Sequence, residues 1–261
     1  MSLLHHESIR YFQSDLLKDN NFKHAFFTKR CHKNEPIELQ NQLNLTSNIH
    51  HLKQIHSDRV IQVNNKLSLK PKIADSLITK EKNQSLWIYT ADCLPILIAD
   101  IKRRNIAACH SGLKGLKKQI ISKTLSRLEG IGSKKNNLII AIGPSINGDK
   151  YQVKKKDVED LIFQLSGKNC IEKNFCLIKS NKEGEGEGEG EEKPIPLFKK
   201  DSNYDRLLID IQAAAILQLF KEGINRNQIN LNRLCTYSNP ALFNSYRRDK
   251  TNLRQWSCIY S

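Results

Sequence analysis

The stretch SLWIYTADCLPILIADIKRRNIAACHSGLKGL, residues 85–116, alternates short apolar runs with polar breaks. The runs at 85–90, 94–99 and 105–109 are rich in Ile, Leu and Ala, and each is bounded by polar or turn residues. Apolar runs of this length and setting are typical of β-strands. The stretch therefore predicts three consecutive strands.

A helical pattern begins where these strands end. After Gly115, apolar residues recur at three- and four-residue steps from Leu116 to Leu128, and Gly130 provides a stop. The same patterns predict further strands at 59–63 and 137–142 and further helices over 158–165 and 207–221. Because strands and helices interleave along the chain, the sequence predicts a mixed α/β fold.

One low-complexity segment interrupts the second half of the chain. Residues 183–192 read EGEGEGEGEE, and alternating glycines and like charges can neither bury a core nor hold a helix. We expect a mobile acidic loop over about residues 182–194. Because motif-bearing segments lie on both sides of this loop, we expect residues 1–261 to form a single domain.

The composition is that of a cytoplasmic globular protein. The chain contains seven cysteines, an odd number without regular spacing, which favours reduced thiols over a secreted disulfide framework. No apolar run approaches the roughly 20 residues that span a bilayer, and the first residues lack the pattern of a secretion signal. We therefore expect a cytoplasmic protein without a membrane partner.

The chain is strongly basic, with 42 Lys and Arg against 27 Asp and Glu and a formal net charge of +15. The basic residues are spread along the sequence, whereas nucleic-acid binding is typical of basic residues clustered on one face. Attraction of phosphate-bearing or anionic small substrates is equally compatible with the charge. A basic nucleic-acid-binding protein is therefore kept only as an alternative.

Three candidate metal ligands fall at the ends of predicted strands. His56 lies in QIHSDRV, Cys93 in TADCLPIL and His110 in ACHSGLKGL. One thiolate and two imidazoles suit zinc, and catalytic zinc sites keep three protein ligands and an open fourth position. The spacing is not a recognised metal motif, however, and by itself it favours two ordinary loop histidines and a buried thiol.

The residues around these three positions carry a family resemblance. HSDRV, TADCLPIL, HSGLKGL, IGPSI and CTYS…FNSYRRD occur in this order, and together they resemble the YfiH family, also called the laccase-domain or multicopper polyphenol oxidase-like family. The resemblance covers roughly residues 24–258. It implies an α/β mixed-sheet layered sandwich with outer helices, and a zinc site made of His56, Cys93 and His110.

The resemblance also implies an activity and further site residues. It implies zinc-dependent phosphorolysis of the purine nucleosides adenosine, inosine, guanosine and methylthioadenosine, with adenosine deamination as a further activity, in a monomer or homodimer. Asp92 could then orient water or accept a proton. The other expected site residues are basic: Arg247 and Lys114 as catalytic groups, and Arg30, Arg59 and Arg248 as substrate-binding groups. In HSGLKG, Leu113 and Lys114 stand where the family has Trp and Arg, and a lysine lacks the planar fork of an arginine.

Cysteine hydrolases and copper oxidases also use His and Cys side chains. A cysteine hydrolase would use Cys93 as nucleophile and His110 as its base, so it shares residues with the zinc site. A copper oxidase needs many imidazoles, but this chain has eight histidines without a His-x-His pair, and a single methionine. The sequence therefore argues against copper.

Overall fold

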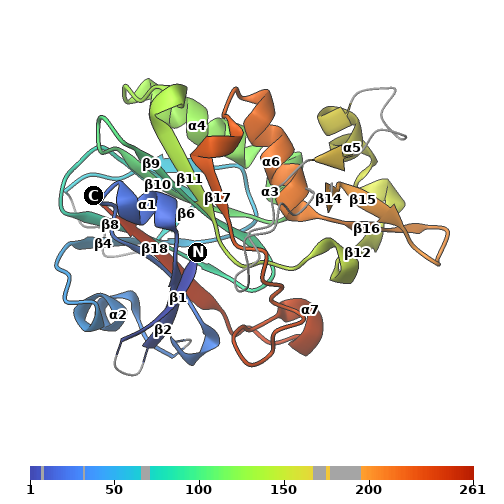
Figure 1. The fold of residues 1–261 in the computed structure, drawn as a ribbon, viewed down its shortest axis with the longest axis horizontal. Helices are drawn as coiled ribbons and strands as arrows, with labels where there is room; N and C mark the ends of the chain where they lie inside the picture. Colours follow the sequence, from blue (N-terminus) through green and yellow to red (C-terminus); the bar gives the residue numbers. More distant parts are fainter. Residues whose placement is uncertain (7–8, 32, 66–70, 167–174, 177–194) are drawn as a thin grey trace, which may run out of the picture.

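The structure, a computed structural model, describes residues 1–6, 9–31, 33–65, 71–166, 175–176 and 195–261. The acidic loop expected over residues 182–194 lies outside these ranges. Two large sheets and a set of helices dominate the fold, as Figure 1 shows.

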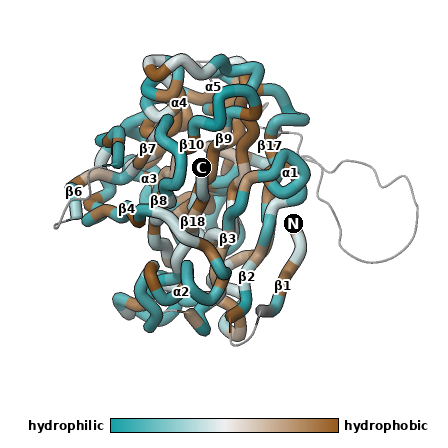
Figure 2. The backbone as a smooth tube through the Cα atoms, turned by 90° about the vertical axis from the view of Figure 1, so that its left-hand side faces the viewer, coloured by the Kyte–Doolittle hydropathy of each residue, from teal (hydrophilic) through white to brown (hydrophobic). Residues whose placement is uncertain are grey.

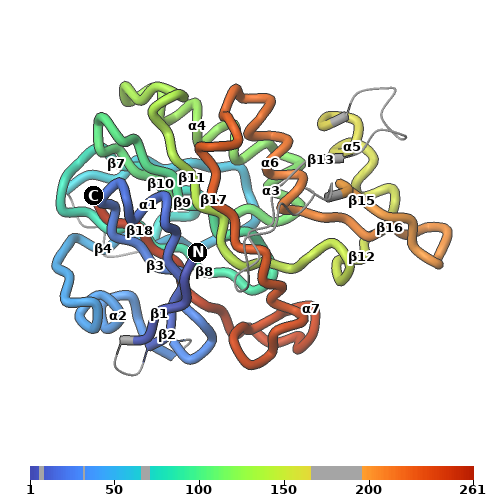
Figure 3. Tube along the Cα trace, viewed as in Figure 1, coloured from blue at the N-terminus to red at the C-terminus, as the bar shows by residue number. Residues whose placement is uncertain are grey.

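The first large sheet contains the strands nearest the two ends of the chain. Its strand order is β1 (Ser2–His6), β2 (Ile9–Gln13), β3 (His24–Phe27), β18 (Gln255–Tyr260), β8 (Gln84–Thr90), β4 (Asn48–Lys53) and β6 (Lys72–Ile73). The C-terminal β18 pairs antiparallel with both β3 and β8, so the chain ends inside the sheet rather than at its edge. Figure 3 shows this closure, with the blue N-terminal strands beside the red C-terminal one.

The second large sheet contains the strands that the sequence predicts most clearly. Its strand order is β17 (Ile229–Leu231), β11 (Leu138–Ile142), β9 (Leu94–Asp100), β10 (Ile106–Ser111), β7 (Ser76–Thr79) and β5 (Val60–Gln62). The strands predicted at 59–63, 94–99, 105–109 and 137–142 are all confirmed in this sheet, and the one at 85–90 is β8 of the other sheet. Both sheets mix parallel and antiparallel pairs, for example β5 with β7 and β9 with β10.

Residue alternation along β9 explains the layering. Leu97 and Ala99 pack between the two large sheets, whereas Ile96 and Ile98 pack on the opposite face against helices. Successive side chains of a strand point to opposite faces, so a strand that is apolar at every position is buried on both. Figure 2 shows this hydrophobic tube along β9 and β10 at the centre of the molecule. The chain is thus the layered α/β sandwich with outer helices that we expected.

The helices cover the outer faces of the sheets. The helices are α1 (Asp15–Asp19), α2 (Pro36–Gln42), α3 (Leu113–Lys117), α4 (Ile120–Gly130), α5 (Glu159–Ser166), α6 (Ile211–Lys221) and α7 (Tyr246–Asp249). Small sheets lie beside α5 and α6, formed by β12 (Gln152–Lys154), β16 (Arg206–Ile209) and β15 (Phe198–Lys200), and by β13 (Phe175–Cys176) and β14 (Ile195–Pro196).

Two predicted helix boundaries are wrong. The helix expected from Leu116 is split, because Gln119 adopts a left-handed φ of 58° between α3 and α4. The helix expected over 207–221 begins only at Ile211, since residues 207–209 belong to β16. Asp210 causes this change: its side chain accepts a hydrogen bond from the Ala213 amide and caps α6.

We expect Asp210→Ala to lower the free energy of unfolding by about 2 kcal/mol, because a helix cap and an ion pair are lost together. The Asp210 carboxylate also pairs with Arg233 at 2.8 Å and is 6% exposed. Urea unfolding measures the change, with Asp19→Ala as a control at an exposed aspartate. Equal stability of the two variants would contradict this account of the α6 boundary.

Candidate metal centre

Strand register brings Cys93 and His110 together. β9 and β10 are antiparallel neighbours, and Pro95 lies opposite His110. Cys93 immediately precedes β9, so it reaches the same edge of the sheet as His110 near the end of β10. Two residues that are 17 positions apart in the sequence therefore share one corner of the fold.

His56 reaches this corner from the loop between β4 and β5. β5 runs parallel to β7, which in turn pairs with β10, so the loop before β5 lies beside the end of β10. His56 has a φ of 59°, in the left-handed region that non-glycine residues rarely adopt. Such strain persists only where surrounding contacts impose it, and it is enriched at functional sites.

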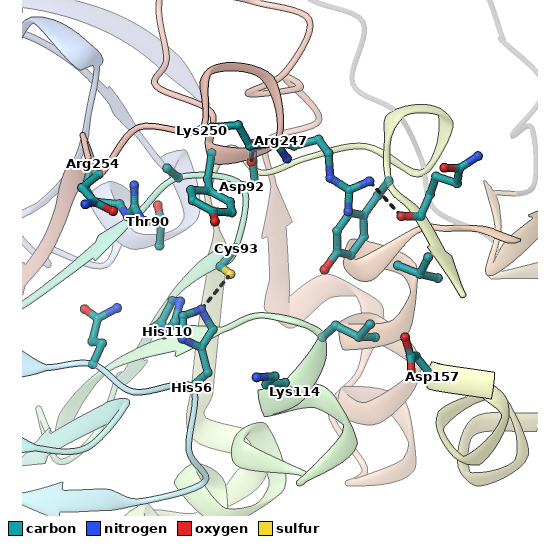
Figure 4. Close-up of a pocket in the computed structure, with 18 of the residues that line it drawn as sticks. His56, Thr90, Asp92, Cys93, His110, Lys114, Asp157, Arg247, Lys250 and Arg254 are labelled. Carbon is teal, nitrogen blue, oxygen red and sulfur yellow. Dashed lines mark hydrogen bonds between the residues drawn. The ribbon is translucent and has the colours of Figure 1, made fainter. Parts of the chain in front are cut away.

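The three side chains meet closely enough to share one ion. One ligand atom from each of His56, Cys93 and His110 lies within 4.8 Å of the others. Cys93 Sγ is 3.8 Å from His56 Nε2, and the two imidazole rings are 4.9 Å apart at their centroids (Figure 4). Tetrahedral zinc with ligand distances of about 2.0–2.3 Å would hold such atoms about 3.3–3.6 Å apart. The donor set and its spacing fit zinc.

A fourth residue, Asp75, orients two of the three side chains. Its carboxylate is fully buried, and Oδ1 accepts from His110 Nδ1 at 2.8 Å and from the His56 amide at 2.9 Å. Oδ2 accepts from the amide and the hydroxyl of Ser57 at 2.6 and 2.7 Å. A carboxylate behind a ligating histidine fixes the ring and leaves the other nitrogen for the metal. Asp75 was not among the site residues predicted from the sequence; a lone acid in the apolar segment KIADSLIT was the available signal.

The electrostatics of the cluster favour a thiolate. Burial alone would raise the pKa of the Cys93 thiol, but the His110 and His56 rings outweigh this and lower it to about 6. Burial would likewise lower the pKa of His110, but the Cys93 sulfur and the Asp75 carboxylate raise it to about 9. The hydrogen bonds from His110 and Ser57 hold the pKa of Asp75 well below its usual range, against the effect of its burial. Thiolate is the form of cysteine that binds metals.

Because Gly112 has no side chain, the Cys93 sulfur can lie directly against its Cα atom. A Cβ atom at this position would lie 2.5 Å from Cys93 Sγ and 3.6 Å from His56 Cδ2. The backbone of Gly112, with φ of −92°, is one that any residue adopts, so the constraint comes from contact alone.

If the cluster holds a metal, we expect Gly112→Ala to weaken its binding by at least about 10-fold, since the methyl group must displace the Cys93 sulfur. Competition with a chromophoric chelator measures the affinity. Gly130→Ala is the matched control, because a Cβ there meets nothing within 4 Å. Wild-type affinity in Gly112→Ala would show that Cys93 is not a ligand.

The cluster forms part of the wall of a cavity of about 1070 Å³. This size is slightly above the roughly 300–1,000 Å³ typical of small-molecule sites. Of the nine site residues expected from the sequence, the cavity lining contains six: His56, Asp92, Cys93, His110, Lys114 and Arg247. Tyr151 and Gln152 also line it, and neither was predicted from the sequence.

Asp92 and Arg247 are joined at the cavity wall. Asp92 has a φ of 86°, and its carboxylate accepts from the Thr236 hydroxyl at 2.6 Å and from the Arg247 amide at 2.7 Å. The Arg247 guanidinium donates to the Gln152 carbonyl at 2.8 Å and lies 4.9 Å from the centroid of the Tyr151 ring. Asp92 thus links the backbone next to Cys93 to the backbone of Arg247 and helps to fix the positions of both residues.

The three arginines that were expected to bind substrate lie outside the cavity lining. Arg248 was expected to bind substrate, but its five guanidinium N–H groups donate to the carbonyls of Thr236, Tyr237 and Phe243 and to both oxygens of Asp249. Arg30 and Arg59 are exposed and do not appear among the described residues of the cavity lining. We therefore leave these three out of the proposed site.

The fold and the site define a class of protein, an α/β sandwich with a single His–Cys–His cluster at the wall of a cavity. Residues 28–261 match the family described as Multi-copper polyphenol oxidoreductase laccase, and the chain belongs to this family. The expected family membership is thereby confirmed.

Relatives and solved structures extend over nearly the whole chain. A purine nucleoside phosphorylase of Synechocystis sp. is 30% identical over 244 residues, 91% of this chain and 89% of the relative. A purine nucleoside phosphorylase of Aquifex aeolicus is 32% identical and covers 79% of each chain. Among solved structures, YlmD from Geobacillus stearothermophilus superposes with a TM-score of 0.78 at 18% identity, covering 98% of this chain and 97% of its own. YfiH from Bacillus licheniformis gives 0.74 at 21% identity, covering 97% and 96%. These two likenesses establish the fold.

Two further observations concern the whole described chain. Within the described ranges, His56, Cys93 and His110 are the only group of three or more His, Cys, Asp or Glu residues placed to share an ion. In the same ranges, every helix is too short or too polar to cross a membrane.

Proposed function

We propose that this protein is a zinc-dependent purine nucleoside phosphorylase in which His56, Cys93 and His110 hold the metal. The observation that carries the proposal is the convergence of these three ligand atoms at the wall of a cavity that also presents Arg247 and Lys114. The relatives named purine nucleoside phosphorylase support the reaction class. The substrates we propose are adenosine, inosine, guanosine and methylthioadenosine, together with inorganic phosphate.

Phosphorolysis transfers a ribosyl group from the base to phosphate. The C1′–N9 bond breaks with its electron pair going to the purine, which takes up a proton, and a phosphate oxygen forms the new bond to C1′. The reaction thus requires an anion held beside C1′ and a base free to leave. When bound, zinc with three protein ligands would supply a positive charge and one coordination position for a phosphate or substrate oxygen.

The chain's own basic groups suit the phosphate. Arg247 is held by the Gln152 carbonyl through Nη1 and by the Tyr151 ring, which leaves its other donors for an anion. Lys114 is exposed at the start of α3 and lines the same cavity. An arginine positioned in this way offers a forked pair of donors to two phosphate oxygens, whereas a lysine acts as a point charge. We assign both to phosphate binding.

Inosine and adenosine turnover with and without phosphate tests the proposal. We expect free hypoxanthine from inosine only when phosphate is present, and loss of this activity on chelation with recovery on zinc addition. Release of ammonia from adenosine in the same assay would establish the deaminase activity that we propose as a second reaction. Base release independent of phosphate would overturn the phosphorylase assignment.

A cysteine hydrolase is the second candidate, and one observation favours it. His110 donates through Nδ1 to the Asp75 carboxylate, and its ring is also hydrogen-bonded to Cys93. Cys93, His110 and Asp75 therefore have the order of a nucleophile, a base and an orienting acid. His56 has no part in such a triad. Removal of His56 therefore separates the two candidates, since only the zinc enzyme requires it.

Three other described histidines give no support to a copper oxidase. His24 bonds to the Ser14 amide and the Phe22 carbonyl, His50 bonds to Gln84, and His51 packs on Trp256. In the described ranges no second cluster offers ligands for further ions. A multicopper centre requires several ligand sets, whereas zinc needs this one alone.

A further inference from the structure

The cavity carries more positive charge than a neutral nucleoside and one phosphate require. Its lining includes six basic side chains: Lys114, Lys154, Arg206, Arg247, Lys250 and Arg254. Among the described residues, none of the six forms an ion pair with a carboxylate. The cavity lining has two carboxylates, and one of them, Asp92, is already bonded to Thr236 and Arg247.

Arg254 is fixed in the manner of a prepared anion receptor. Its Nη1 donates to the carbonyls of Thr251 and Leu253 at 2.9 and 2.8 Å, which holds the guanidinium in one place. Within the described part of the chain, its Nε and Nη2 have no hydrogen-bond partner. Arg248 shows the contrasting case, with all five donors satisfied and Asp249 as its ion pair.

An aromatic ring and a second cation accompany Arg254. The Tyr246 ring is 49% exposed, and it lies 5.6 Å from the Arg254 guanidinium and 5.4 Å from Lys250 Nζ. The ring attracts each of the two cations separately and so helps to hold both beside it. Tyr246, Lys250 and Arg254 therefore form a compact group, which we call the Tyr246 subsite.

The Tyr246 subsite is separate from Arg247, the arginine that we assign to binding inorganic phosphate. In Figure 4, Arg254 lies on one side of Cys93 and Arg247 on the other. Both arginines are anchored through Nη1 to backbone carbonyls. The cavity therefore contains two prepared anion receptors, with His56, Cys93 and His110 between them. Phosphorolysis of a neutral nucleoside uses only one.

We propose that the Tyr246 subsite binds a 5′-phosphate carried by the substrate, so that adenosine, inosine and guanosine are turned over more efficiently as their 5′-phosphates than as free nucleosides. This inference rests on the proposed phosphorylase function. C1′ and C5′ lie at different ends of the ribose ring, so the attacking phosphate and the 5′-phosphate need two receptors. The reaction balances as before: the C1′–N9 bond breaks, a C1′–O bond forms, and the products are the protonated purine and ribose 1,5-bisphosphate.

The test compares kcat/KM for inosine 5′-monophosphate and inosine in wild type and variants. We expect the nucleotide to be preferred by about 10-fold or more, because a charged group meets prepared charged donors. Arg254→Gln should reduce this preference by about 10-fold, and Arg254→Lys, which keeps the charge, should restore part of it. Lys23→Gln, an exposed lysine outside the cavity lining, is the control for net charge and should keep the wild-type preference.

Two results would overturn the inference. One is a wild-type enzyme that prefers the nucleoside. The other is an Arg254→Gln variant that loses nucleoside and nucleotide turnover equally, which would place Arg254 on the base or ribose.

Binding of inosine and inosine 5′-monophosphate, measured by calorimetry, tests the 5′-phosphate subsite independently of the proposed phosphorylase function. Arg254-dependent tighter binding of the nucleotide supports the subsite even in a protein that cleaves neither ligand, whereas equal binding of both ligands contradicts it. Absence of turnover for both ligands contradicts the phosphorylase assignment alone.

Discussion

His56→Asn is expected to remove bound zinc and to lower phosphorolysis of inosine by about 100-fold or more, because a metal contributes several kcal/mol to such reactions. Asparagine tolerates the left-handed φ of 59° at this position better than most residues, so the loop should keep its path. An amide is a poor zinc ligand, however, and the site would be left with Cys93 and His110. Zinc content and steady-state kinetics on the same preparation measure both effects.

His51→Asn is the matched control for this variant. His51 packs edge-on against Trp256 on β18 and is outside the cluster. It should keep full zinc content and turnover. Full turnover in His56→Asn without zinc would contradict the zinc-dependent mechanism. It would favour the cysteine hydrolase, because Cys93, His110 and Asp75 would all remain in place.

Asp75→Asn is expected to weaken zinc binding by about 10- to 100-fold, the usual cost of removing a carboxylate behind a ligating histidine. We also expect the free energy of unfolding to fall by about 2–3 kcal/mol, since charged hydrogen bonds in a buried site are lost. Every oxygen of Asp75 accepts hydrogen bonds, so the amide group of asparagine must face a donor whichever way it turns. Chelator competition and urea unfolding give the two values.

The control for Asp75 is Asp58, which lies in the loop between β4 and β5 that carries His56. Asp58 is partly exposed and pairs with Lys123 at the surface, and exposed pairs contribute about 0–1 kcal/mol. Asp58→Asn should therefore bind zinc as wild type does. If the two variants bind zinc equally well, Asp75 does not orient His110, and the burial of its carboxylate has another cause.

The central sheet could be predicted because its strands are short, apolar and buried on both faces. β9 and β10 are of this kind, and the turn between them is polar. β3 and β18 were missed because their apolar residues are mixed with His, Gln and Ser, and their place in the sheet depends on pairing across the whole chain. The start of α6 was misplaced because an apolar run continues from β16 into the helix, and only the cap at Asp210 divides them.

The three candidate metal ligands could be predicted from the family resemblance, but the residues that support them could not. Asp75 lies 19 positions from His56 and 35 from His110, and only the register of β5, β7 and β10 brings it to both. Arg247 and Arg248 are neighbours in the sequence, and both were expected to act on the substrate. They lie in α7, where Arg247 reaches the cavity and Arg248 turns to the loop carbonyls.

X-ray absorption at the zinc edge of the purified protein tests the metal site most directly. We predict about one zinc per chain, with one sulfur neighbour at about 2.3 Å and two nitrogen neighbours at about 2.0 Å. Cys93→Ala should abolish the sulfur signal and most of the bound metal. A zinc spectrum without sulfur, or full zinc content in Cys93→Ala, would contradict the site on which the proposed function depends.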